Sequence, residues 1–264
     1  MSEAQLSPPR RSWSDRAFDL LVWGGLAVLL VVSFGPAEVG KLPLLFSNNA
    51  NMREFASEFL RPDFSAWRTY VAQMWLTVQM ALWGTTLALL IAVPLGLAGS
   101  ANIAPVWVRQ PVRRIMDILR SVPELVIGVL FAVTVGLGPF AGVMALALHT
   151  GGVLGKLFSE AVEAIDRAPV EGVRATGAGR LQEIVWGVIP QVAPLWTSYA
   201  LYRLESNSRA ATVLGIIGAG GIGTLLFDAI NGFYYGQVSA IVIVVVVAVS
   251  LIDLLSQAIR TRLL

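Results

Sequence analysis

The residues best suited to chemistry in this 264-residue chain are few. There is no cysteine, which excludes disulfide frameworks, thiolate zinc sites, iron–sulfur clusters and c-type haem attachment. His149 is the only histidine, so one chain cannot build a multi-histidine metal site. Thr150 is its only hydroxyl-bearing neighbour, and a hydrolase needs a nucleophile with a partnered base. We therefore expect no catalytic and no metal-binding residue.

Two glycine-rich stretches imitate nucleotide sites. Gly218–Gly223 satisfies the string GxGxxG, but the dinucleotide fingerprint also needs an acidic residue about 20 positions further on, where only Val238 to Val245 stand. Gly155 and Lys156 look like the end of a phosphate loop, but Leu157 offers no hydroxyl for Mg²⁺. We expect no cofactor in this chain, so any energy source must be another subunit.

The composition is that of an integral membrane protein. Charged residues make up 14% of the chain, against about 25% in an ordinary globular protein, and 56% of the residues are hydrophobic. So little polar surface cannot cover a water-soluble particle of this size. The net charge of +2 is spread over short basic clusters, so we expect no nucleic-acid partner.

Six apolar stretches are long enough, or nearly so, to cross about 30 Å of hydrocarbon as helices. The final stretch holds a valine-rich run that would favour a strand in water, but an unpaired strand in lipid leaves its backbone unsatisfied. The first stretch also fits a secretory signal with cleavage near Ala37, although we expect a retained span. The fold class is therefore an all-α membrane protein with spans at Leu20–Pro36, Met74–Leu97, Val122–Gly138, Phe140–Leu157, Val185–Leu204 and Val238–Gln257.

The basic residues predict the orientation. Thirteen of the nineteen Lys and Arg residues fall on one side, including Arg10 and Arg11 in the N-terminal tail, which makes that side and both termini cytoplasmic. In the long first connection, Asn51–Glu54 fits the capped start of a helix on the outer membrane surface. Residues 1–71 thus comprise the cytoplasmic tail, first transmembrane helix and periplasmic interfacial segment, and residues 72–260 comprise the main transmembrane domain.

The cytoplasmic connection between the fourth and fifth spans has a helical pattern. Pro169 suits a first helical position, and Glu171 complements the helix dipole. Gly177-Ala178-Gly179 interrupts the pattern as a C-terminal cap would. We expect two short helices with a bend, exposed to the cytoplasm. An amphipathic pair lying on the membrane face is the simpler alternative.

The spacing of this connection resembles the EAA loop of permeases in binding-protein-dependent ABC importers. Glu171, Gly177 and Pro190 are in register with the pattern E-A-A, three residues, G, nine residues, I-x-L-P. Gly172 and Val173 replace the alanines, Gly187 replaces the isoleucine and Ile189 replaces the leucine. The stretches that resemble the phosphonate importer family more specifically are Thr77–Thr85, Val135–Gly142, Glu205–Gly215 and Gly218–Gly223.

This resemblance implies a type I ABC importer permease core of five helices plus an N-terminal helix. It further implies a permease for phosphonate or phosphite in the cell inner membrane. Its partners would be a second copy of itself, two cytoplasmic ABC ATPase subunits and a periplasmic phosphonate- or phosphite-binding protein. The ATPase-coupling residues would be Pro169, Glu171, Gly172, Arg174, Gly177 and Pro190.

Polar residues in or near the membrane are candidates for the outer gate or the substrate pathway. Arg203 and Arg209, which we place near the outer end of the fifth span, could meet an anionic substrate, and pairing of Glu205 with a neighbouring arginine is the structural alternative. At the third span, helical spacing allows Arg120 to pair with Asp117 and Glu124. The full set of gate or pathway candidates is His149, Arg203, Glu205, Asn207, Arg209, Gly220 and Gly221.

Two alternative classes of function remain open. A permease for another small solute, of the methionine or quaternary amine type, would have the same loop and spans. A channel or an intramembrane enzyme would leave the patterned cytoplasmic loop unexplained. Co-purification with an ATPase would discriminate between the classes.

Overall fold

The computed structural model describes residues 13–47 and 49–263, and every regular element there is helical. The chain divides into two units, residues 1–57 and 58–264. The tail that carries Arg10 and Arg11, and the side chains of Asn51 and Glu54, lie outside what is described. The first unit contains α1 (Trp13–Phe34), the short helix η1 (Val39–Lys41), α2 (Leu44–Ser47) and most of α3 (Asn49–Phe59).

Helix α1 is the first expected span. Its large apolar side chains, including Leu21, Val31 and Val32, are exposed, as suits a helix surrounded by lipid. It begins seven residues before the predicted start at Leu20 and has 22 residues, which is long enough for a bilayer. The predicted short helix near Asn51 is also present, as α3.

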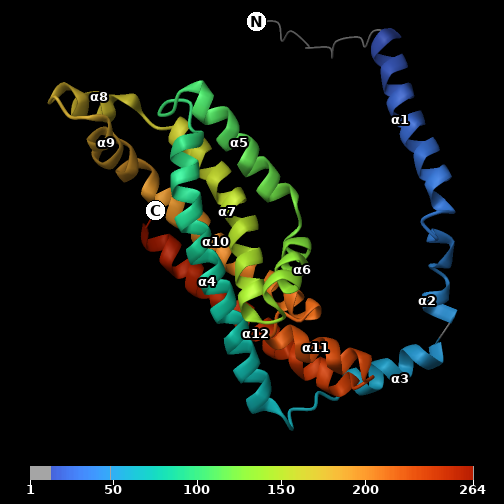
Figure 1. Cartoon of the computed structure of the whole chain (residues 1–264). Coiled ribbons are helices and arrows are strands. Elements are labelled where there is room, and N and C mark those ends of the chain that lie inside the picture. Colours follow the sequence, from blue (N-terminus) through green and yellow to red (C-terminus); the bar gives the residue numbers. More distant parts are fainter. Residues whose placement is uncertain (1–12, 48, 264) are drawn as a thin grey trace, which may run out of the picture. The chain divides into compact units, whose positions relative to one another are not determined.

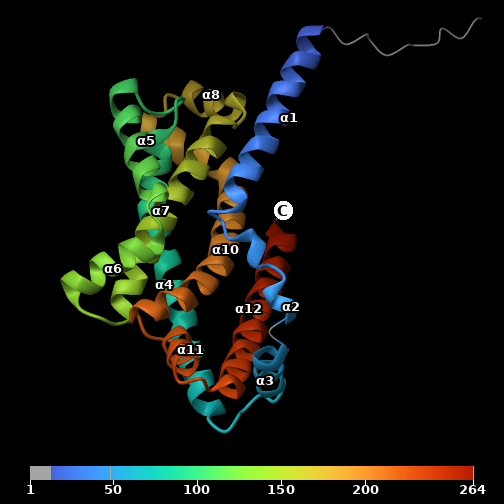
Figure 2. The same cartoon turned by 90° about the vertical axis from the view of Figure 1, so that its right-hand side faces the viewer.

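The second unit is a bundle of membrane-length helices with shorter helices at both ends (Figures 1 and 2). Its central pair is α4 and α7, which pack along one another. Gly96 lets them approach closely, because a Cβ atom there would lie 2.6 Å from that of Phe158. The elements of this unit are α4 (Trp67–Gly99), α5 (Val106–Ser121), α6 (Glu124–Val135), α7 (Pro139–Glu163), α8 (Arg167–Ala175), α9 (Arg180–Gln182), the π-helix η2 (Glu183–Val188), α10 (Ile189–Leu214), η3 (Gly215–Ile217), α11 (Ile222–Asn231) and α12 (Tyr235–Leu263).

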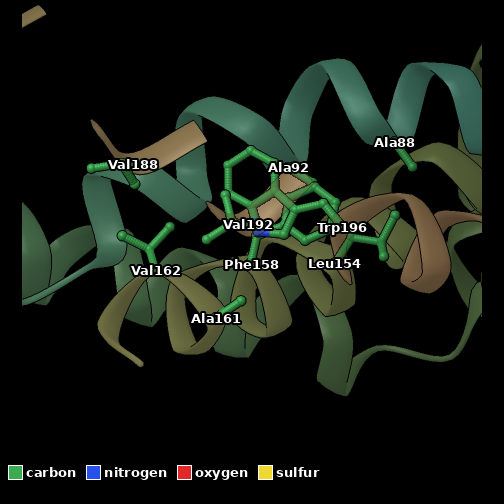
Figure 3. Close-up of a cluster of buried hydrophobic side chains, with 9 residues drawn as sticks. All are labelled: Ala88, Ala92, Leu154, Phe158, Ala161, Val162, Val188, Val192 and Trp196. Atoms are coloured by element: carbon green, nitrogen blue, oxygen red, sulfur yellow. The ribbon is translucent and has the colours of Figure 1, made fainter. Parts of the chain in front are cut away.

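Three helices meet in a buried cluster that leads toward the loop between α7 and α10. Phe158 of α7 stacks on Trp196 of α10, with ring centroids 4.4 Å apart, beside Ala88 and Ala92 of α4 (Figure 3). Val188 of η2 belongs to the same cluster. Burial of a large apolar side chain contributes about 1.5–3 kcal/mol, so the loop is attached to a well-buried part of the bundle.

The span count depends on how bent helices are treated. In the described residues, four helices are long and apolar enough to cross a membrane alone, and six spans result if each of two bent pairs counts as one. The predicted third span, Val122–Gly138, is helical but shorter than predicted: α6 has only 12 residues and reaches the length of a span only together with α5, from which it is bent by 89°. The cause is local: Val122 precedes Pro123 and is held in extended backbone.

The segments predicted as the fifth and sixth spans lie in the helices α10 and α12, with the start of the fifth in η2. Helix α10 continues ten residues beyond the predicted end at Leu204, to Leu214. Arg203 therefore lies in the middle of the helix, and our placement of it near the end of the span is wrong, whereas Arg209 lies close to the end of the helix at Leu214. The valine-rich run within α12 is helical, as the lipid argument predicts.

Candidate functional site: the coupling loop and the intramembrane polar groups

The coupling loop, which we define as residues 164–188, begins with a capped helix. The Asp166 carboxylate accepts a hydrogen bond of 3.0 Å from the Ala168 N–H and caps α8. The helix therefore starts at Arg167. Pro169 is its third residue, whereas we predicted that it would be the first. Proline is still tolerated there, since the first-turn N–H groups have no partner within the helix.

Gly177 ends this helix as predicted. Its φ of +84° is left-handed, and its N–H donates to the Arg174 carbonyl at 3.0 Å. Gly172, in the middle of the same helix, has ordinary backbone and open space around the position of a Cβ atom. The two glycines therefore have different roles: Gly177 is required by backbone geometry, whereas Gly172 leaves room on the outer surface of the helix.

An ion pair joins α8 to the helix that follows. The Arg174 Nε and Nη2 atoms donate to the two Glu183 carboxylate oxygens, each at 2.8 Å. This hydrogen bonding raises the pKa of Arg174, so it remains charged. Gly187 completes the joint, because a Cβ atom there would lie 3.0 Å from the Cα of Val170. The departure from isoleucine at position 187 thus has a structural reason: α8 packs directly against its backbone.

The loop has two recesses. A polar cavity of about 300 Å³ lies between α8 and η2, with Glu171, Arg174 and Glu183 in its wall. A more open hollow of about 680 Å³ is lined by Gly172, Gly177 and other residues of the same loop. The predicted coupling residues therefore surround concave surfaces, which suit the docking of a protein partner.

Gln191 is a residue that sequence reasoning missed. Its Oε1 accepts from the Asp166 N–H at 3.2 Å, and its Nε2 donates to the Asp166 carbonyl at 3.2 Å and to the Gly187 carbonyl at 2.6 Å. It fastens the start of the coupling loop to the junction of η2 and α10. The only signal in the sequence was its position directly after Pro190. In the structure this position follows the π-helical segment η2.

Asn207, a pathway candidate, is used for packing in this chain. It is buried, accepts from the Thr150 hydroxyl at 2.8 Å and donates to the Thr85 hydroxyl at 2.9 Å. The three side chains come from α10, α7 and α4 and form what we call the buried polar bridge. In a membrane interior such a bridge satisfies all three groups internally and holds the helices in register.

Three further pairs of charged or ionisable side chains lie in or near the spans. Glu205 pairs with Arg209 at 2.6 Å, as the structural alternative predicts. His149 lies beside Glu124, with 3.7 Å between Nε2 and the carboxylate, and Arg120 pairs with Asp117 at 2.9 Å. The predicted Arg120–Glu124 pair does not form in the described structure, because the bend between α5 and α6 separates them.

The glycine turn before α11 is held by α4. Gly220 and Gly221 have φ of +81° and +75°, which explains why glycine is needed there. The N–H of Ile222 donates to the Thr77 hydroxyl of α4 at 2.9 Å. The turn is therefore a fixed connector in this unit, and the described residues contain no group of three or more His, Asp and Glu that could hold a metal ion.

A bundle of four to six candidate membrane-spanning helices in the described residues defines a multi-pass membrane protein. Residues 84–264 match the family described as binding-protein-dependent transport system inner membrane component. The chain belongs to this family, and it is therefore a component of the inner membrane.

Relatives with assigned names resemble much of the chain. It is 39% identical to the phosphite transport system permease protein PtxC of Stutzerimonas stutzeri over 82% of this chain and 79% of that protein. It is 60% identical to the cryptic phosphonate transport system permease protein PhnE2 of Escherichia coli K12 over 44% of this chain and 96% of that protein. It is 43% identical to the phosphate-import permease protein PhnE of Mycolicibacterium smegmatis over 71% of this chain and 36% of that protein.

Solved structures support the fold. The permease in an inward-facing structure of the MetNI methionine ABC transporter is similar with a TM-score of 0.67 and 22% identity, over 74% of this chain and 95% of that one. At this identity the similarity concerns the fold alone. It agrees with the type I ABC importer permease core that the sequence predicts.

Proposed function

We propose that this chain is the permease subunit of an ABC importer that moves a phosphonate or phosphite across the inner membrane. The observation that carries the proposal is the 39% identity with a phosphite permease along most of both chains. The helical coupling loop supports it, because a rigid helix fastened to the bundle by Arg174–Glu183 and Gln191 can transmit motion from an ATPase to the spans.

The same proposal supplies the partners. Two ATPase subunits bind ATP and Mg²⁺ and dock on the coupling loops, so this chain acts as a transport subunit and not as an enzyme. A periplasmic binding protein delivers the substrate, and both termini lie in the cytoplasm. One unit of this size cannot enclose a central pathway, so two copies form it as a symmetric dimer.

Phosphate is a second candidate substrate, favoured by the 43% identity with a phosphate-import permease. Methionine is a weaker candidate, since the methionine permease MetP of Bacillus subtilis is 26% identical over 46% of this chain. Phosphonate, phosphite and phosphate share one chemistry, because each is a tetrahedral phosphorus oxyanion.

The test is ATP-driven uptake into vesicles that contain the permease and its ATPase, with the binding protein added on the outer side. Labelled phosphite, methylphosphonate, phosphate and methionine are supplied separately. We expect ATP-dependent uptake of phosphite or methylphosphonate. Uptake of methionine alone, or of no solute, would refute the proposal, and a mass measurement that finds one permease per complex would refute the dimer.

A further inference from the structure

Three ionisable residues stand on three helices that pack against one another, α6, α7 and α10. His149 of α7 has its Nδ1 atom 3.0 Å from the Val122 carbonyl and its Nε2 atom 3.7 Å from the carboxylate of Glu124, at the start of α6. Arg203 stands in the middle of α10, which packs against both α6 and α7. We call these three residues the intramembrane cluster.

The hydrogen-bonding groups indicate how the cluster is charged. The Val122 carbonyl can only accept, so the Nδ1 atom of His149 carries a proton and donates it. The Nε2 atom then faces the Glu124 carboxylate. Arg203 stays charged in any protein environment. The cluster therefore combines one guanidinium cation and one imidazole N–H donor with one carboxylate.

Arg203 has a hydrogen-bond donor without a partner. Its Nε atom is buried and makes no hydrogen bond in the structure. An unpaired buried donor is destabilising, and such a group inside a membrane is a functional candidate. Arg209, on the same helix, differs because its guanidinium already bonds to Glu205.

The cluster is rigidly mounted and accessible. Val122, Leu148 and Leu204, which are close neighbours in sequence of the cluster residues, pack against one buried hydrophobic core. The side chains of Glu124 and His149 nevertheless keep 34% and 18% of their surface exposed. The polar groups can therefore be reached from a face that this unit leaves uncovered.

We propose that the intramembrane cluster is a transient binding site for a phosphorus oxyanion on its way through the membrane. This inference rests on the proposed function. The planar guanidinium of Arg203 suits the tetrahedral oxygens of phosphite or a phosphonate, and His149 adds a second donor. Glu124 competes with the passing anion for these two donors, which keeps binding weak enough for release inward.

The experiment compares Arg203→Gln with wild type in the vesicles described above, with labelled phosphite as the probe. We expect phosphite uptake to fall at least tenfold, while ATP hydrolysis stimulated by the loaded binding protein stays within twofold. Arg203→Lys restores at least a third of the uptake, because it returns the charge without the planar fork. Glu124→Gln lowers both the maximal uptake and the apparent KM, since the anion is then held longer.

A matched control is Arg114→Gln, which removes an exposed cation from α5 and leaves uptake unchanged. If wild type takes up none of the oxyanions, the proposed function fails. If wild type takes up phosphite and Arg203→Gln equals it, only this inference fails. Equal loss of ATP hydrolysis and uptake in Arg203→Gln, with a lower melting temperature, would mean a structural role and would also overturn the inference.

Discussion

The coupling loop and the intramembrane polar groups are built in opposite ways. The loop is one continuous segment whose caps and turns lie within about 25 residues, and its Arg174–Glu183 pair spans nine positions. The buried polar bridge joins Thr85, Thr150 and Asn207, which are separated by up to 122 positions. The difference shows that a motif can encode a local device, whereas a membrane site is assembled only by folding.

The largest effect is expected at the cap of the coupling helix. Gly177→Pro fixes φ near −65° where the structure needs +84°, and it removes the N–H that bonds to Arg174. The loop loses its bend, so ATP-driven uptake should fall more than tenfold while the permease still inserts and assembles. Uptake into vesicles and membrane fractionation measure the two quantities.

Gly172→Ala is the control for this change. Position 172 has ordinary backbone and open space, so alanine should leave uptake within twofold of wild type. Wild-type uptake in Gly177→Pro would contradict the role of the cap. A loss in Gly172→Ala as large as that in Gly177→Pro would show that the surface of the helix, and not its end, decides coupling.

The second prediction concerns the buried polar bridge. Asn207→Leu keeps the volume but leaves the Thr150 hydroxyl without its acceptor, which should cost about 1–3 kcal/mol of stability. We expect a lower melting temperature in detergent and a matching loss of assembled complex. Thr86→Val is the control, since that exposed hydroxyl bonds only to the Leu82 carbonyl of its own helix. Equal melting temperatures of Asn207→Leu and Thr86→Val would show that the buried polar bridge does not stabilise the protein.

Much of the fold could be predicted because lipid imposes simple rules. The valine-rich run of α12 and the helical loop with its Gly177 cap follow from backbone satisfaction and capping. The length of the third span was not predicted correctly, because α6 has only 12 residues and reaches span length only with α5, from which the Val122–Pro123 step bends it by 89°. The contacts of His149 and Asn207 were not predictable, since their partners lie on other helices and nothing in their own segments identifies them.

A smaller effect is expected where the loop meets α10. Gln191→Leu removes the amide that bonds to both backbone groups of Asp166 and to the Gly187 carbonyl. The loop then moves less tightly with α10, so uptake per ATP hydrolysed should fall about three- to fivefold, as expected for loss of about 1 kcal/mol of hydrogen bonding. Thr197→Val, which removes only a bond within α10, should keep the wild-type ratio. Equal ratios in the two variants would show that Gln191 does not connect loop and span.

The smallest effect distinguishes the two arginines of α10. Glu205 and Arg209 stand one helical turn apart and bond at 2.6 Å, and such pairs contribute about 0.2–0.5 kcal/mol. Glu205→Arg or Arg209→Glu alone places like charges side by side, so each should lower uptake by about twofold or less. The double exchange restores the pair in reverse and should recover wild-type uptake if the pair only supports the helix. If Arg209 instead meets the substrate, the double exchange puts a carboxylate at position 209 and uptake stays low. The variant Arg209→Gln separates the two cases. Wild-type uptake in this variant would mean that Arg209 does not meet the substrate, and it would leave Arg203 as the cation of α10 that acts on the anion.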